Sequence, residues 1–140
     1  MTDTVTGLIW VRNAGCFGGR QWVAANQTAA ALADGQCGLL DGSSAGDWRL
    51  PTKEEWEATV AQARYLGCLS PSLTNTAGSG CYYSGGSEPF VGVLSNIIYW
   101  SSTTDASNPS VAWYVSLGNG GVSSVSKNVG GYVWPVRGGR

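Results

Sequence analysis

Histidine is absent from this 140-residue chain, and charged side chains are scarce. Without histidine, the chain lacks the commonest general base and the commonest protein ligand for transition metals. Asp, Glu, Lys and Arg make up only 12% of the residues and the net charge is −1, so no basic surface for nucleic acid is expected. No apolar run reaches the roughly 18 residues of a membrane-spanning helix. We therefore expect no nucleic-acid partner, no membrane insertion, no metal and no cofactor.

Tryptophan and glycine, by contrast, are abundant, with seven Trp and 21 Gly. Each Trp can bury a large apolar area while its single N–H needs only one partner. A chain of this length is expected to form one domain with a sizeable core. We therefore predict a single domain over residues 1–140, held together by indole rings and joined by polar, turn-rich segments. The seven residues are Trp10, Trp22, Trp48, Trp56, Trp100, Trp113 and Trp134.

The four cysteines are Cys16, Cys37, Cys68 and Cys81, at separations of 21, 31 and 13 residues. A zinc site made of four thiolates and a set of buried free thiols are two alternatives, but neither a Cys-x-x-Cys pair nor a histidine is present. An even number of cysteines in a small Gly- and Ser-rich domain favours two disulfides and an oxidising compartment. Of three possible pairings, Cys16–Cys37 and Cys68–Cys81 are preferred, because each would cross-link a loop-rich segment and contribute about 3 kcal/mol.

Two helices are predicted in the first half of the chain. In residues 20–33, apolar side chains recur at intervals of 3, 4 and 3, which is one face of a helix. The second helix follows Pro51, where Thr52 and Glu55 form a capping-box pattern, and it ends at Gly67. Two helices followed by a series of strands indicate an α+β domain.

The remaining segments are predicted to be strands and loops. Residues 6–11 open the chain as a strand, and residues 70–92 form a long polar loop. Later strands are expected at residues 97–103, 111–117, 122–127 and 132–137. Residues 119–121, Asn-Gly-Gly, are a strong hairpin turn, and Pro135 favours an edge or a bulge in the last strand.

Candidate catalytic groups are few, so we expect no enzyme. Glu54, Glu55 and Glu57 lie in the first turns of the second predicted helix, where acidic side chains complement the helix dipole. Ser101 and Ser102 have no histidine to activate them.

The late hairpins carry the candidate ligand-binding residues. Tyrosine offers contact area at a low entropy cost, and Ser, Gly and Asn offer adaptable hydrogen bonds, as in recognition loops. The alternative is an ordinary solvated hairpin. The candidates are Asp105, Asn108, Tyr114, Asn119, Ser124, Ser126, Lys127, Asn128 and Tyr132.

Several short segments of the sequence together resemble the Lcl C-terminal domain family. This family takes its name from the tip domain of a bacterial collagen-like adhesin. The resemblance runs from Gly7 to Gly139 and is much more specific in combination than in any single motif. It is carried by Gly35-Gln36-Cys37-Gly38-Leu39, Asp41-Gly42-Ser43, Ala45-Gly46-Asp47-Trp48-Arg49-Leu50-Pro51-Thr52, Tyr99-Trp100-Ser101-Ser102-Thr103, Ala112-Trp113, Gly120, Lys127 and Val133-Trp134-Pro135-Val136-Arg137-Gly138-Gly139.

This resemblance implies a C-type-lectin-like α+β fold, with two helices packed on a twisted antiparallel sheet. It also implies an extracellular or cell-surface location, in an exported bacterial protein or at the tip of a bacterial or phage fibre. The expected partner is a cell-surface glycan, sulfated in the case of the named adhesin, or a surface protein, and the expected assembly is a homotrimer.

Two other functions are kept as alternatives. One is a structural trimerisation cap of a fibre, and the other is an enzyme of the sulfatase-modifying type, whose fold is loosely similar. The chain lacks the calcium motif of lectins and the copper-binding cysteine pair of the sulfatase-modifying enzymes, and it has only eight Lys and Arg. A non-enzymatic adhesin or fibre-tip domain is therefore the preferred interpretation.

Overall fold

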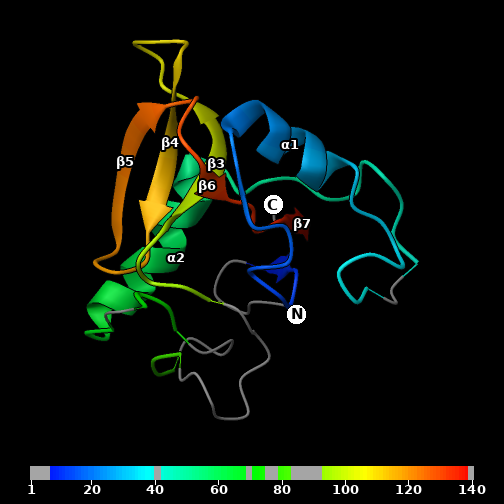
Figure 1. Cartoon of the computed structure of the whole chain (residues 1–140). Helices are drawn as coiled ribbons and strands as arrows, with labels where there is room; N and C mark the ends of the chain where they lie inside the picture. The colour runs from blue at the N-terminus through cyan, green and yellow to red at the C-terminus, as the bar shows by residue number, and fades with distance from the viewer. Residues whose placement is uncertain (1–6, 40–41, 69–70, 75–78, 83–92, 139–140) are drawn as a thin grey trace.

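The computed structural model describes residues 7–39, 42–68, 71–74, 79–82 and 93–138. Much of the predicted long loop at residues 70–92 lies outside these ranges. The described part contains two helices and seven strands (Figure 1). In chain order they are β1 (Leu8–Trp10), β2 (Gly19–Arg20), α1 (Trp22–Ala30), α2 (Lys53–Tyr65), β3 (Ile98–Thr104), β4 (Val111–Ser116), β5 (Gly121–Ser126), β6 (Gly131–Tyr132) and β7 (Val136–Gly138).

The strands form a five-stranded sheet in the order β2-β6-β3-β4-β5 and a separate two-stranded sheet of β1 and β7. The α+β class is therefore confirmed, while the more specific C-type-lectin-like fold stays a prediction of the resemblance. The larger sheet is mixed rather than purely antiparallel, because β3 and β6 run parallel, with Tyr99 opposite Tyr132. The other strand pairs are antiparallel, as predicted.

The two helices cover opposite faces of the five-stranded sheet. Neighbouring residues of a strand point to opposite faces, and Tyr99 and Trp100 of β3 accordingly belong to different core clusters. Tyr99 packs in the cluster that contains Trp56 of α2, and Trp100 packs in the cluster that contains Ala25 of α1. In Figure 1, α2 runs along the sheet beside β4 and β5, and α1 lies near β3 and β6.

The predicted indole core is confirmed. Trp10 lies at the centre of one cluster, with ring centroids 5.1 Å from Trp56 and 4.9 Å from Trp134. The buried indole N–H groups of Trp48, Trp56, Trp100 and Trp134 each reach an acceptor, for example Trp134 Nε1 to the Val11 carbonyl at 2.7 Å. Such rings stabilise the core through apolar burial and through tilted or edge-to-face contacts.

The first helix is shorter than predicted. Gly19 and Arg20 pair with Tyr132 and Gly131 as the short strand β2, so their backbone is extended and α1 begins only at Trp22. The helix ends at Ala30, although Leu32 beyond it is still buried. The second helix agrees with the prediction, because Thr52 and Glu55 form the expected reciprocal capping box.

The last predicted strand, residues 132–137, is interrupted. Its two ends belong to different sheets, as β6 and β7. Between them Trp134 turns into the core, and the carbonyl of Pro135 accepts a hydrogen bond from the Val11 N–H at 3.1 Å. Proline cannot donate to a strand ladder, so the chain leaves one sheet here and enters the other.

Both preferred disulfides are confirmed, because Cys16 is bonded to Cys37 and Cys68 to Cys81. This pairing overturns the alternatives of a zinc site and of free thiols. None of the described helices combines the length and the hydropathy needed to cross a membrane.

Candidate functional site

One end of the five-stranded sheet carries most of the predicted ligand-binding side chains. The connection from β3 to β4, residues 105–110, projects beyond the strands at this end (Figure 1). The last residues of β5 and the turn that follows it lie beside this connection, since the Lys127 N–H donates to the Ser110 carbonyl at 3.0 Å. We call this region the polar end. It comprises residues 105–110, Ser124, Ser126, Lys127 and Asn128.

The projecting connection is held by its own side chains. Asp105 Oδ1 accepts the backbone N–H of Ser107 at 2.9 Å and its hydroxyl at 2.7 Å. Asn108 Oδ1 repeats this pattern with the N–H and hydroxyl of Ser110, at 3.1 and 2.7 Å. These local side-chain to backbone bonds fix an exposed loop in one conformation, which lowers the entropy cost of binding a ligand.

Asp105 also ties the projecting connection to the sheet, because its Oδ2 accepts the Ser124 hydroxyl at 3.1 Å. The hydrogen bonds from the Ser107 N–H and hydroxyl are the main causes that lower the pKa of Asp105, and the Ser124 hydroxyl and the charge of Lys53 lower it further. Asp105 is therefore a carboxylate at neutral pH, on the surface of the polar end.

Two lysine–tryptophan pairs flank the polar end. Lys53 Nζ lies 4.2 Å from the centroid of the Trp113 ring, and Lys127 Nζ lies 4.0 Å from the centroid of Trp22. Trp113 is adjacent to Tyr114, which packs on the α1 side together with Trp22, so Trp113 points to the other face of the sheet. Each face of the sheet thus has one partly covered indole with a cation over it.

The beginnings of both helices place these lysine–tryptophan pairs. The backbone N–H of Trp22, at the start of α1, donates to the Lys127 carbonyl at 3.1 Å. The Lys53 N–H, at the start of α2, donates to the Thr103 hydroxyl at 2.9 Å. Lys53 and Trp22 were not among the predicted site residues, because their partners lie far away in the sequence. The repeated Asp-x-Ser and Asn-x-Ser pattern of the projecting connection is a local signal that could have indicated its fixed conformation.

Three predicted residues lie elsewhere. Tyr114 is half-buried on the α1 side of β4. Asn119 lies at the opposite end of β4, where its Oδ1 accepts the Gly121 N–H at 2.8 Å. Tyr132 is half-buried against the core, with its ring centroid 6.1 Å from that of Tyr99. The structure therefore brings Asp105, Asn108, Ser124, Ser126, Lys127 and Asn128 together and separates these three from them.

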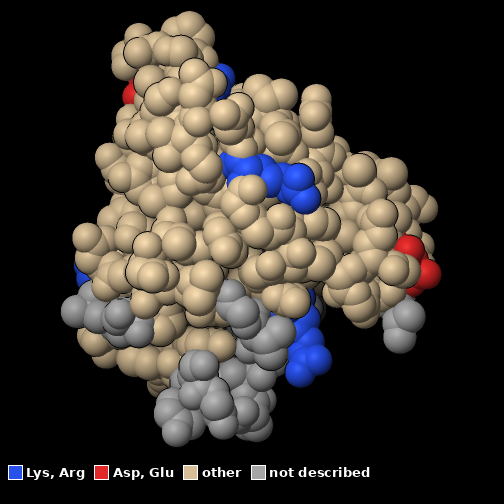
Figure 2. All heavy atoms as spheres, in the orientation of Figure 1, with Lys and Arg blue, Asp and Glu red and all other residues tan. Residues whose placement is uncertain are grey.

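The surface chemistry is dominated by uncharged groups. Figure 2 shows that the face seen in Figure 1 has few Lys or Arg atoms and fewer Asp or Glu atoms. Within the described ranges, no group of three or more Cys, Asp or Glu is placed to hold a metal ion. The groups that the polar end offers to a ligand are hydroxyls, amides, one carboxylate and the Lys127 ammonium, and the Lys53 ammonium flanks it.

An α+β domain with two disulfides, an indole core and a projecting polar loop defines a class of small, cross-linked domain suited to an oxidising environment. The chain belongs to the Lcl C-terminal domain family, whose family model matches residues 1–137. A comparison with the curated proteins found no match. The family is non-enzymatic and indicates a surface-associated domain of a fibre- or adhesin-like protein.

Proposed function

We propose that this domain recognises a cell-surface glycan or a surface protein, outside the cell, through the polar end. The observation that carries the proposal is the projecting connection of residues 105–110. Its exposed side chains are fixed by hydrogen bonds that Asp105 and Asn108 accept. A partner would meet groups that are already ordered, so more of the contact energy appears as affinity.

The chemistry of the polar end favours a glycan over a protein partner. A saccharide offers many hydroxyl groups, and these match the serine hydroxyls and the Asn108 and Asn128 amides. Lys53 and Lys127 add two cations, which can meet one or two sulfate or carboxylate groups on the saccharide. Two lysines are too few to hold a long polyanion by charge alone.

A matched pair of asparagine variants tests this site. Asn108 and Asn119 both accept hydrogen bonds in turns, but they lie at opposite ends of β4. We expect Asn108→Ala to weaken binding at least tenfold on a glycan array and on whole cells, and Asn119→Ala to retain it. An equal effect of the two changes, or binding of the parent chain to neither the array nor the cells, would contradict the proposal.

A structural trimerisation cap is the second candidate, and two exposed valines favour it. Val23, 57% exposed, and Val129, 41% exposed, lie within two residues of the hydrogen bond that joins Trp22 to Lys127. Three copies that covered these side chains would form a homotrimer, and several weak sites on it would act together. Light scattering measures the oligomeric state of the parent and of a Val23→Ser, Val129→Ser double variant. A trimer that depends on the valines and binds no surface would favour the cap.

A further inference from the structure

Strand β5 is an open edge of the five-stranded sheet. Among the described strands it pairs only with β4, in continuous register from Gly121 opposite Ser116 to Ser126 opposite Val111. In an antiparallel ladder, alternate residues direct both the N–H and the C=O away from the neighbouring strand. No other described segment pairs with this outer side of β5. The edge therefore offers a row of backbone donors and acceptors.

The strand lacks the usual protection of an edge. Natural edge strands are blunted by charged residues, prolines or bulges, which prevent another strand from adding. The six residues of β5, Gly-Val-Ser-Ser-Val-Ser, contain no charge and no proline, and their pairing with β4 has no bulge. A sheet edge without such protection can pair with an added strand.

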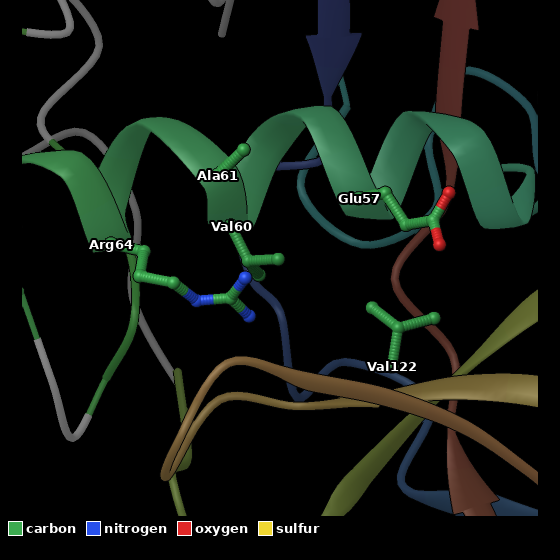
Figure 3. Close-up of a pocket in the computed structure, with 5 residues that line it drawn as sticks. All are labelled: Glu57, Val60, Ala61, Arg64 and Val122. Carbon is green, nitrogen blue, oxygen red and sulfur yellow. The ribbon is translucent and has the colours of Figure 1, made fainter.

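A groove runs beside this edge. It has a volume of about 350 Å³ and is lined by Glu57, Val60, Ala61 and Arg64 of α2 and by Val122 of β5. In Figure 3, Val122 points from the sheet toward the helix, the Arg64 side chain extends between the helix and the sheet, and the Glu57 side chain lies along the helix. The groove can take the side chains of a strand that adds to β5.

The charged side chains at the two ends of the groove define the orientation of a strand bound there. The Arg64 guanidinium donates to the Gly120 carbonyl at 2.9 Å, so it lies at the beginning of β5, and no other described group accepts from it. Glu57 lies seven residues earlier on α2, about 10 Å along the helix. Its side chain is 47% exposed and 3.5 Å from the Lys53 ammonium. A strand antiparallel to β5 would pass Glu57 first and Arg64 last.

From these features we infer that β5 and the groove bind an extended peptide segment of a partner protein. The segment adds as an antiparallel strand and places an apolar side chain in the groove against Val122 and the exposed Ala61. A basic residue two positions earlier faces Glu57, and an acidic residue two positions later faces Arg64, because side chains two apart share one face of a strand. The pattern is Lys-x-Val-x-Asp. This site differs from the polar end and does not depend on its ligand.

A charge-reversal experiment tests the inference on the full 140-residue chain. The probes are two synthetic peptides, acetyl-Thr-Lys-Thr-Val-Thr-Asp-Thr-amide and its counterpart with Lys and Asp exchanged. We expect the first peptide to shift the backbone amide NMR signals of residues 121–126 and to bind at least tenfold more tightly than the second. The double variant Glu57→Lys, Arg64→Glu should reverse this preference. An Arg20→Glu variant, changed at an exposed arginine away from the groove, should keep the original preference.

Three results would overturn the inference. One is the absence of shifts in β5, and another is equal binding of the two peptides by the parent chain. The third is a concentration-dependent shift of the same β5 signals without peptide, which would assign the edge to a second copy of this chain. Because glycan binding is measured at another surface, the failure of one proposal leaves the other intact.

Discussion

Tyr99 places its phenol in the aromatic core, with ring centroids 5.6 Å from Trp134 and 6.1 Å from Trp56. Its oxygen accepts the Leu94 N–H at 3.0 Å. Desolvation by burial raises the pKa of Tyr99 to about 12. A tyrosine in the unfolded chain has a pKa of about 10. The folded state therefore holds the phenol proton more tightly, and the stability from this group is lost as the pH rises from about 10 to 12.

The prediction at this residue is that Tyr99→Phe removes part of the alkaline loss of stability. The variant should cost about 1 kcal/mol at pH 7, because the Leu94 N–H loses its acceptor. Its unfolding free energy should then fall less steeply than that of the parent above pH 10. Urea unfolding from pH 7 to 11 measures both effects. Tyr65→Phe is the control, since Tyr65 is 84% exposed. Parallel pH profiles for all three proteins would disprove the role of Tyr99.

Residue contacts could be predicted where the partners are close in the sequence. The Thr52–Glu55 capping box is defined by a spacing of three residues, and each predicted disulfide cross-links one loop-rich segment. The Lys53–Trp113 pair could not be predicted, because its partners are 60 residues apart and no local pattern links them. The prediction for the polar end therefore includes Lys127 but not Lys53.

At the scale of elements, two adjacent glycines lie in different surroundings: Gly130 ends the turn after β5, and Gly131 begins β6. A Cβ on Gly131 would lie 2.8 Å from Nε1 of the buried Trp100, whose N–H donates to the Arg20 carbonyl. A Cβ on Gly130 would meet nothing within 4 Å, and neither residue has a positive φ. The close approach of β6 to the indole is therefore what requires glycine at position 131.

This pair of glycines gives an internally controlled prediction. Gly131→Ala should destabilise the fold by about 1–3 kcal/mol, because either the indole or β6 must move. Gly130→Ala should change the stability by less than about 0.5 kcal/mol, as an exposed substitution without a contact. Thermal unfolding followed by near-UV circular dichroism measures both. If the two variants unfold at the same temperature, the close packing of β6 on Trp100 is not a constraint.

The elements themselves could be predicted where one pattern spans the whole segment. The second helix has a capping box at its start and an apolar face along its length, and its bounds agree with the prediction. The start of α1 and the break between β6 and β7 were missed for a common reason. Gly19 and Tyr132 pair with each other across more than a hundred residues, and this pairing decides where helix and strand begin.

At the scale of the whole molecule, the two disulfides connect segments that have little regular structure. Cys16–Cys37 joins the approach to α1 with the segment that follows it, and Cys68–Cys81 joins the end of α2 with the segment that follows that helix. Such cross-links reduce the number of conformations open to the unfolded chain. They supply stability that a small, charge-poor domain would otherwise need from a larger core.

We predict that removal of either disulfide costs about 3 kcal/mol, since the closed loops span 21 and 13 residues. For a chain of this size the melting temperature should fall by roughly 10 °C for each bond. Calorimetry of the Cys16→Ala, Cys37→Ala and the Cys68→Ala, Cys81→Ala double variants measures the two effects separately. A double variant that melts with the parent would show that its bond adds nothing to stability.

The order of elements along the chain was enough to predict the α+β class, but not the arrangement of the sheet. The parallel pairing of β3 with β6 depends on the final segment crossing between sheets at Trp134 and Pro135. That crossing is set by the burial of one indole in a core assembled from the whole chain. Only tertiary packing decides where the chain crosses from one sheet to the other.

The small sheet of β1 and β7 has a practical consequence. Leu8 lies opposite Gly138, so the first and last described strands are antiparallel neighbours, and Figure 1 shows β7 away from the projecting connection. Neighbouring ends allow a domain to be inserted into another protein. A surface loop of an unrelated host could therefore carry this domain as a guest, with entry and exit only a strand's width apart and the opposite extremity still directed into solution.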